Sequence, residues 1–205
     1  MDERERGNRV AGLLLAAGGG RRLGGRPKAL LPYRGRPLVE HAVRALRAGG
    51  CAPVYVVLGA ARERARAEAE LPGCTLVDNP DWARGMGSSL RAGLRRLTAD
   101  GVPAAADAAL VGLVDQPGIG AAAVARLVAA ATGPRVLAAA AYGGERGHPV
   151  LLGAAHWDGV AQAATGDRGA RDYLRRHAAD LRLVECADVA DPDDIDTPED
   201  LARHG

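Results

Sequence analysis

Cationic side chains and glycines are concentrated in residues 18–32, directly after an apolar segment. These fifteen residues contain five glycines, three arginines and one lysine, and no carboxylate. Backbone N–H groups in a glycine-rich turn can close around phosphate oxygens, and Arg and Lys side chains supply positive charge to a polyphosphate. The composition predicts a phosphate-binding loop; the alternative is a solvent-exposed basic loop without a ligand.

Two well-known phosphate loops do not fit this segment. A P-loop requires GxxxxGK followed by Ser or Thr, but Gly25 stands where the lysine is required. A dinucleotide fingerprint requires GxGxxG, but Leu23 stands at the third glycine. No acidic residue ends the next apolar run, 54–58, where it would hold a ribose. The segment therefore predicts a phosphate loop of a different kind.

Two carboxylates are candidates for a metal site. Asp115 follows the apolar run 108–114, and an aspartate at the end of a buried parallel strand is well placed to bind Mg²⁺. Asp196 is the second candidate, although a residue before a helix can instead serve as its cap, a role that Thr197 can also fill. Asp194 is expected to point the other way if its segment is extended. Capping of the turn at Gln116 is the structural alternative for Asp115.

Apolar runs alternate with amphipathic segments along the chain, which predicts an α/β fold with three layers, α/β/α, around a mostly parallel sheet. In such a sheet ligands bind outside the carboxyl ends of the strands, so the glycine-rich loop and Asp115 belong to one edge. A helix opened by Ser88 or Ser89 is expected to bury leucines at i, i+4 and i+7. The predicted strands are 10–16, 54–58, 74–77, 108–114, 136–141, 150–152 and 181–185; the predicted helices are 37–48, 60–70, 88–97, 120–131, 167–177 and one from 197.

Length and composition predict one domain over 10–205, preceded by a flexible tail over 1–9. A net charge of +2 argues against nucleic acid as a partner, and no apolar run is long enough to span a membrane. The tail lacks the pattern of a signal peptide. Three cysteines without CxxC spacing predict neither a disulfide framework nor a cysteine metal site, which favours the cytoplasm.

Six segments in order carry a family resemblance, from about Val10 to Leu201. "LAAGGGRRLGGRPKALLP" resembles the signature LAAGxSxRMGxxKxLLP of nucleotidyltransferases that use a nucleoside triphosphate. "NPDWARGMGSSLRAGL", "LVDQP", "GERGHPVLL", "GDRGARDYL" and "DIDTPEDL" resemble the molybdenum cofactor cytidylyltransferase branch of the MobA-like family. Gly20 replaces the usual Ser of the signature, and Leu23 replaces the usual Met. The first departure removes a hydroxyl that could contact a phosphate.

The resemblance implies a Rossmann-like fold of the GT-A-like nucleotidyltransferase type and transfer of CMP from CTP to a molybdopterin-type cofactor, with release of pyrophosphate and dependence on Mg²⁺. It implies catalytic roles for Lys28 at the α-phosphate, Arg22 at the outgoing phosphates and Asp115 with Asp196 as metal ligands. The implied nucleotide-binding residues are Leu15, Ala16, Ala17, Gly18, Gly19, Gly20, Arg22, Lys28, Gly85, Met86, Gly87 and Ser88. The implied acceptor-binding residues are Gly147, His148, Pro149, Arg168 and Arg171, with a structural hydrogen bond as the alternative role of His148.

Other functions remain open from the sequence. Within the same chemistry, GTP or another phosphorylated acceptor could replace CTP and the phosphorylated pterin, and a molybdoenzyme or its chaperone could be a partner. Some members of the resembling family are named as nicotinamide-dependent reductases of a nicotine-derived dye, but the failed dinucleotide fingerprint argues against that function. A carrier of the pterin cofactor without catalysis is a third possibility, and the presence of Lys28, Asp115 and Asp196 argues against it.

Overall fold

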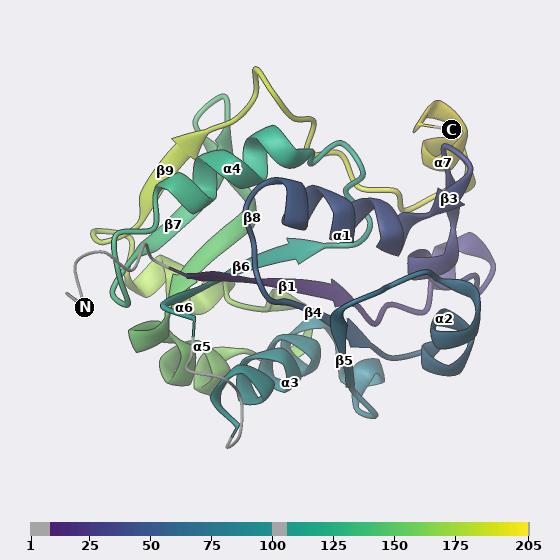
Figure 1. Ribbon diagram of the computed structural model, residues 1–205, viewed down its shortest axis with the longest axis horizontal. Helices are drawn as coiled ribbons and strands as arrows, with labels where there is room; N and C mark the ends of the chain where they lie inside the picture. Colours follow the sequence, from purple (N-terminus) through teal and green to yellow (C-terminus); the bar gives the residue numbers. More distant parts are fainter. Residues whose placement is uncertain (1–8, 100–105, 205) are drawn as a thin grey trace.

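The computed structural model describes residues 9–99 and 106–204 (Figure 1). The predicted tail lies outside these residues except for Arg9. The backbone N–H of Arg9 donates to a carboxylate oxygen of Asp107 at 2.9 Å, and its carbonyl accepts from the N–H of Asp107 at 2.8 Å. These bonds join the start of the first strand to the start of a neighbouring one.

A seven-stranded sheet forms the centre of the molecule, with the order β5-β4-β1-β6-β8-β7-β9. All neighbours are parallel except β8, which runs antiparallel to both β6 and β7. The three-layer, mostly parallel sheet is therefore confirmed. The strands are β1 (Val10–Ala16), β4 (Val54–Leu58), β5 (Cys74–Asp78), β6 (Ala108–Leu113), β7 (Leu137–Tyr142), β8 (Glu145–Gly153) and β9 (Arg182–Glu185).

Helices cover both faces of the sheet, as Figure 1 shows. α1 (Leu38–Ala48) and α4 (Ala121–Ala129) pack on one face, and α3 (Met86–Thr98), α5 (Trp157–Ala163) and α6 (Arg171–Arg176) lie on the other. Every residue of β1 is buried, because both of its neighbours and both helical layers cover it. The core is built mainly of Ala, Val and Leu, as the scarcity of aromatic residues predicts.

Shorter elements complete the chain. α2 (Arg62–Glu68) follows β4, α7 (Pro198–His204) ends the described chain, and β2 (Pro32–Tyr33) pairs with β3 (Arg36–Pro37). β9 is an edge strand, as its alternating pattern predicts. Thr197 caps α7 as predicted, because its Oγ1 accepts from the N–H of Asp200 at 3.2 Å and the Asp200 carboxylate accepts from the N–H of Thr197 at 2.8 Å.

Several predicted boundaries are wrong. α3 begins at Met86 after Gly85, so neither Ser88 nor Ser89 is its cap; both are buried in its first turn, where Asn79 donates to their hydroxyls. The strand predicted at 150–152 is nine residues long, because it forms an antiparallel hairpin with β7. The helix predicted to start at Asp167 or Gly169 is preceded by a 3₁₀ turn, 166–168, and begins only at Arg171 as the short α6. The short helix α5 was not predicted.

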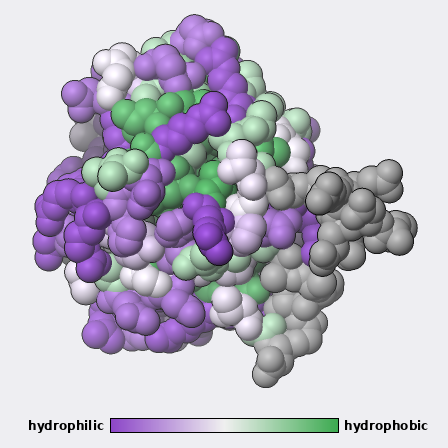
Figure 2. Space-filling model, turned by 90° about the vertical axis from the view of Figure 1, so that its left-hand side faces the viewer, coloured by the Kyte–Doolittle hydropathy of each residue, from purple (hydrophilic) through white to green (hydrophobic). Residues whose placement is uncertain are grey.

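The fold places the carboxyl ends of β1, β4 and β6 at one edge, on the right of Figure 1, where α7 and the loop after β1 also lie. Figure 2 shows the opposite end of the molecule, which is mostly hydrophilic around a hydrophobic patch. The sheet therefore brings together the loop after β1, Asp115 in the turn after β6 and the segment before α7, which are far apart in the sequence.

Candidate active site

The glycine-rich loop folds back on itself directly after β1. Gly20 adopts φ +62°, and its carbonyl accepts from the N–H groups of Leu23 at 2.9 Å and Gly25 at 3.0 Å. A Cβ on Gly20 would lie 1.8 Å from the carbonyl oxygen of Arg26, so no side chain fits there. This contact explains why glycine, and not the serine of the resembling signature, occupies this position. Two 3₁₀ turns, Arg21–Leu23 and Lys28–Leu30, lie within the loop, whereas an α-helix follows the first strand in a dinucleotide fold.

Lys28 lies between the two predicted metal ligands. Its Nζ donates to Oδ2 of Asp115 at 2.5 Å and to Oδ1 of Asp196 at 2.5 Å. Burial lowers the pKa of Lys28, but the charges and hydrogen bonds of the two carboxylates outweigh it and raise the pKa above its usual value. Arg22 donates to the other oxygen of Asp196 at 3.2 Å. Two cations from the glycine-rich loop therefore meet the two carboxylates predicted from sequence.

The fold explains how two aspartates eighty residues apart in the sequence reach one lysine. Asp115 follows β6 at the carboxyl edge, and its carbonyl accepts from the N–H of Ile195 at 2.8 Å. The Ile195 side chain is fully buried in the core on the α1 face, which anchors the segment before α7. Because Thr197 caps α7, the carboxylate of Asp196 is free to meet Lys28 and Arg22.

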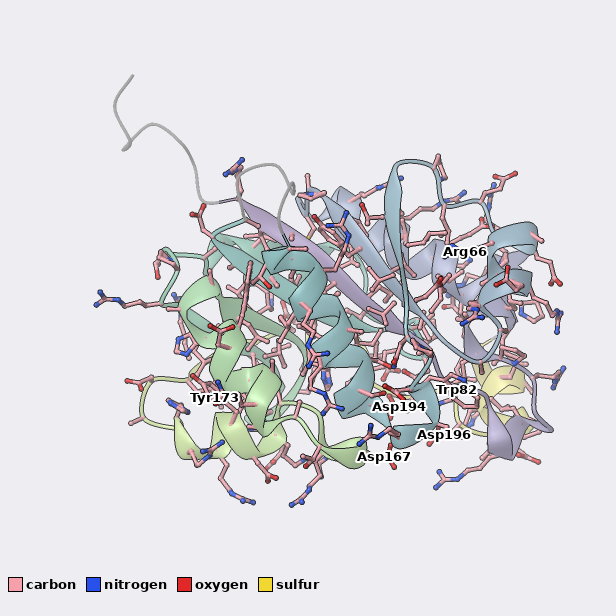
Figure 3. The ribbon with its side chains drawn as sticks, turned by 90° about the horizontal axis from the view of Figure 1, so that it is seen from below. Arg66, Trp82, Asp167, Tyr173, Asp194 and Asp196 are labelled. Atoms are coloured by element: carbon pink, nitrogen blue, oxygen red, sulfur yellow. The ribbon has the colours of Figure 1, made fainter. Side chains whose placement is uncertain are left out.

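Asp194 precedes Ile195 in a segment, 191–196, that belongs to no helix or strand. Burial and the nearby charge of Asp115 raise the pKa of Asp194, while a hydrogen bond with Gln116 lowers it. Figure 3 shows Asp194 and Asp196 at the same end of the molecule. Asp194 is therefore a neighbour of the candidate site, although Lys28 contacts only the other two carboxylates.

A cavity of about 350 Å³ opens beside Lys28 and Asp115. Its walls come from the end of β1, the loop after it, the end of β6 and the segment between β5 and α3. Of the residues implied to bind nucleotide, the cavity brings together Leu15, Ala17, Gly18, Gly19, Lys28, Gly85 and Met86. Gly20, Arg22, Lys28 and Asp196 line a smaller adjoining hollow of about 170 Å³.

Some implied nucleotide-binding residues do not line these cavities. Ala16 is buried on the α1 face of the sheet. Gly87 packs against Thr165, because a Cβ added to Gly87 would lie 2.8 Å from the backbone nitrogen of Thr165. The hydroxyl of Ser88 donates to the carbonyl oxygens of Gly85 at 2.8 Å and Asp81 at 2.9 Å. The structure thus gives Gly87 and Ser88 local packing roles at the start of α3.

A second cavity, of about 340 Å³, lies next to the first and shares Leu15, Met86 and Asp167 with it. Arginines and the apolar side chains of two layers line it, which suits a ligand with an anionic group and an apolar body. Four of the implied acceptor residues, Gly147, His148, Arg168 and Arg171, lie here, together with Arg146, Leu90, Val111, Val150, Leu152, Ala170 and Leu174. Pro149 does not line this cavity but a small hollow of about 20 Å³ behind it.

His148 makes no side-chain hydrogen bond within residues 9–99 and 106–204, so the structural role considered for it is not observed; its carbonyl accepts from the Tyr142 hydroxyl at 2.7 Å. Burial lowers the pKa of His148 to about 4, so the imidazole is neutral near pH 7. Arg168 forms a salt bridge with Asp172, with 3.1 Å between Nη1 and Oδ2. Arg146 was not identified from the sequence, although it belongs to the quoted segment "GERGHPVLL".

Sequence reasoning missed Trp82 as a wall residue of the first cavity, and it expected Asp167 to face the acceptor, whereas Asp167 lines both cavities. Both belong to segments that carry the family resemblance, and the carboxylate of Asp167 accepts from the N–H of Met86 at 3.4 Å. Figure 3 shows Trp82, Asp167, Asp194 and Asp196 at one end of the molecule, with Tyr173 well away from them. The spacing of Trp82 and Asp167 gave no signal, because tertiary packing brings their two loops together.

The donor set suits a hard divalent cation. Two carboxylate oxygens already meet one ammonium nitrogen at 2.5 Å each, so the side chains converge on a single positive charge. Within the described ranges no group of three or more His, Cys, Asp or Glu could hold a metal ion. A pair of carboxylates fits Mg²⁺, which commonly binds one or two protein carboxylates and completes its shell with substrate phosphates and water.

A three-layer fold with a cationic glycine loop and two carboxylates at the carboxyl edge defines a nucleotidyltransferase. Comparison with known proteins agrees: the family described as "MobA-like NTP transferase domain" matches residues 12–181. The chain belongs to this family. In the described part of the chain, no helix has both the length and the apolar character needed to cross a membrane.

Three relatives illustrate the range of the family. A protein of Paenarthrobacter nicotinovorans named nicotine blue oxidoreductase is 42% identical over 201 residues, covering 95% of each chain. A molybdenum cofactor guanylyltransferase of Cereibacter sphaeroides is 34% identical over 204 residues, also covering 95% of each. The crystal structure of Rv0371C of Mycobacterium tuberculosis in complex with manganese superposes with a TM-score of 0.76 at 27% identity, covering 95% of this chain and 97% of that one.

Proposed function

We propose that this nucleotidyltransferase transfers CMP from CTP to the phosphate of a molybdopterin-type cofactor and releases pyrophosphate. The observation that carries the reaction type is the meeting of Lys28, Asp115 and Asp196 beside a glycine-rich loop and a 350 Å³ cavity. An oxygen of the acceptor phosphate attacks the α-phosphorus, a new P–O bond forms, and the bond to the pyrophosphate oxygen breaks. Such a transfer depends mainly on charge neutralisation and alignment of the reacting groups.

The chain's own residues supply three contributions to this reaction. Gly18 and Gly19 line the cavity, and their backbone N–H groups would bind phosphate oxygens there. Lys28 donates to the α-phosphate, where negative charge develops in the transition state, and Arg22 donates to the outgoing phosphates. For this, Lys28 would leave the two carboxylates that it contacts in the structure. The α-phosphate would then replace them as its anionic partner.

Asp115 and Asp196 would hold the divalent cation, for which we propose Mg²⁺. When bound, the cation neutralises the charge of the triphosphate and of the departing pyrophosphate. Lys28 contacts the same two carboxylates, so a cation held by Asp115 and Asp196 would share these side chains with the lysine. In this proposal the carboxylates keep Lys28 at the edge of the cavity and would also hold the cation.

The choice of CTP rests on the segments "GMGSSL" and "GHPVLL", which resemble the cytidylyltransferase branch. The 34% identical relative is named a guanylyltransferase, so GTP is the alternative nucleotide. The second cavity supports an acceptor with an anionic group, since Arg146, Arg168 and Arg171 line it together with apolar side chains. A phosphorylated pterin has both properties, and a molybdoenzyme or its chaperone would receive the product.

An oxidoreductase is the second candidate function, favoured by the 42% identity to a protein of that name. The loop after β1 argues against it, since it leads into a 3₁₀ turn and not into a helix whose N-terminus could hold a dinucleotide pyrophosphate. A nicotinamide dinucleotide also carries less charge per phosphate chain than a triphosphate. The cationic loop therefore suits the triphosphate better.

The test is a thermal-shift titration with CTP, GTP, NADH and NADPH, each with Mg²⁺, followed by a pyrophosphate-release assay with molybdopterin. We expect CTP to raise the melting temperature, because a ligand that binds only the folded state stabilises it by about 2.7 kcal/mol at one hundred times its dissociation constant. A larger shift with GTP changes the base and leaves the reaction type intact. A shift with NADPH alone, together with NADPH oxidation in the presence of a dye, contradicts the transferase proposal.

A further inference from the structure

Trp82 packs directly against the glycine-rich loop. A Cβ placed on Gly19 would lie 3.1 and 3.2 Å from two carbons of the six-membered ring of Trp82, so this glycine lies against the indole. On Gly59, after β4, an added Cβ would lie 2.6 Å from the Cβ of Trp82. The side chain thus occupies space that two glycines leave free at the ends of neighbouring strands. It lines the same cavity as Lys28 and is half-buried.

The backbone around Trp82 is held firmly. Its N–H donates to the carbonyl of Asn79 at 3.3 Å, and its carbonyl accepts from the N–H of Gly85 at 3.1 Å. The Asn79 side chain is buried and donates to the hydroxyls of Ser88 at 2.8 Å and Ser89 at 3.0 Å. The first turn of α3 therefore fixes the position from which the indole meets the loop.

Besides the indole, the Cβ of Ala60 lies 3.4 Å from the position that a Cβ on Gly19 would take. A Cβ added to Gly18 would meet no atom within 4 Å. Glycine also loses more conformational entropy on ordering than any other residue. A loop whose N–H groups are already ordered pays less of that cost when the phosphates bind. The indole is the large rigid surface that can order Gly19.

We propose that Trp82 is a positioning residue for the triphosphate: it holds the Gly18–Gly19 backbone in the conformation that binds phosphate oxygens. The inference rests on the proposed function, since it assigns a role within the same nucleotide site. It assigns Trp82 to the phosphate chain and not to the base. The role is therefore measurable with a ligand that has no base.

The experiment compares the binding of inorganic tripolyphosphate and of CTP, both with Mg²⁺, to the wild-type chain and to Trp82→Ala and Trp82→Phe. Loss of preorganisation predicts that Trp82→Ala weakens both ligands by about tenfold, and that Trp82→Phe restores most of the affinity. Trp157→Phe is the matched control. Trp157 is only 3% exposed and lies in the core on the α3 face of the sheet, where its indole N–H donates to the carbonyl of Leu152 at 2.8 Å.

A second measurement keeps the proposal testable if Trp82→Ala does not fold. Since the chain has two tryptophans, Trp157→Phe leaves Trp82 as the sole indole fluorophore. In that background we expect tripolyphosphate to change the emission of Trp82. Gly19→Ala, which presses a methyl group on the ring, shifts the emission of the ligand-free chain, whereas Gly18→Ala does not.

The outcomes separate the two proposals. If Trp82→Ala weakens CTP but not tripolyphosphate, the indole contacts the base and the inference is overturned. Equal binding of both ligands by wild type and Trp82→Ala, or an emission that tripolyphosphate leaves unchanged, also overturns it while the proposed function stands. A wild-type chain that binds neither CTP, GTP nor tripolyphosphate overturns the proposed function and this inference together.

Discussion

Replacing Lys28 with glutamine should tighten the binding of a divalent cation to the nucleotide-free chain. In the structure the ammonium group contacts the two carboxylates that we propose as metal ligands, at 2.5 Å from Asp115 and 2.5 Å from Asp196. On this proposal a cation has to displace both contacts. Glutamine is similar in length but carries no charge, so it does not compete for two carboxylates in the same way.

The size of the effect follows from the exposure of the three groups. Lys28 and Asp115 are 16% and 20% exposed, and a hydrogen bond to a charged partner in such surroundings contributes about 1.5–3 kcal/mol. Asp196 is 40% exposed, so its contact contributes well under 1 kcal/mol. The glutamine side chain recovers part of the lost hydrogen bonding. A net gain of about 2 kcal/mol corresponds to roughly thirtyfold tighter binding of the cation.

The assay is titration of the nucleotide-free chain with Mn²⁺, followed by electron paramagnetic resonance of the free ion. Lys28→Gln should bind one Mn²⁺ ion about thirtyfold more tightly than wild type. It should lose turnover, because no lysine ammonium group then faces the α-phosphate. The double variant Lys28→Gln with Asp115→Asn is the control and should lose the gain. Unchanged or weaker Mn²⁺ binding by Lys28→Gln would refute the view that lysine and metal share these oxygens.

Three further predictions concern the same edge of the sheet. Asp115→Ala and Asp196→Ala should each abolish pyrophosphate release while circular dichroism stays native; near-normal rates in both would contradict the two-carboxylate site. Gly20→Ala should weaken triphosphate binding far more than Gly24→Ala, because both glycines adopt positive φ but only at Gly20 would a Cβ meet a carbonyl, at 1.8 Å; calorimetric titration measures the difference, and equal effects would contradict the steric argument. Burial lowers the pKa of His148 from 6.5 to about 4, so the unfolded chain binds the imidazole proton more tightly than the folded chain does. The contribution of His148 to the free energy of unfolding is therefore complete above pH 6.5 and falls by about 3 kcal/mol as the pH drops to 4. Denaturant titrations of His148→Gln should lose this part of the pH dependence, and an unaltered profile would argue against a buried neutral imidazole.

The sequence determined the elements whose physical signal is local. Continuous apolar runs correctly predicted β1, β4 and β6, because a strand covered on both faces must be apolar throughout. Alternation identified the edge strand β9, and the Thr197-Pro198 pair predicted the start of α7, since capping acts within four residues. The glycines and cations of the loop after β1 also predict a phosphate-binding loop, because charge and backbone freedom are properties of the residues themselves.

Only the tertiary structure decided how these elements meet. β8 extends to nine residues because β6 and β7 flank it, which no local pattern records. α3 begins before its two serines because Asn79 draws their hydroxyls into the core and Gly85 turns the chain.

The candidate site shows the same division. Sequence identified Lys28, Asp115 and Asp196 separately, but their convergence needs the parallel order of β1 and β6 and the bond from Ile195 to the carbonyl of Asp115. The contact of Trp82 with Gly19 likewise depends on two loops meeting above the sheet edge. Residue chemistry is fixed by the sequence, whereas distances between residues far apart in the chain are set by the packing of the whole core.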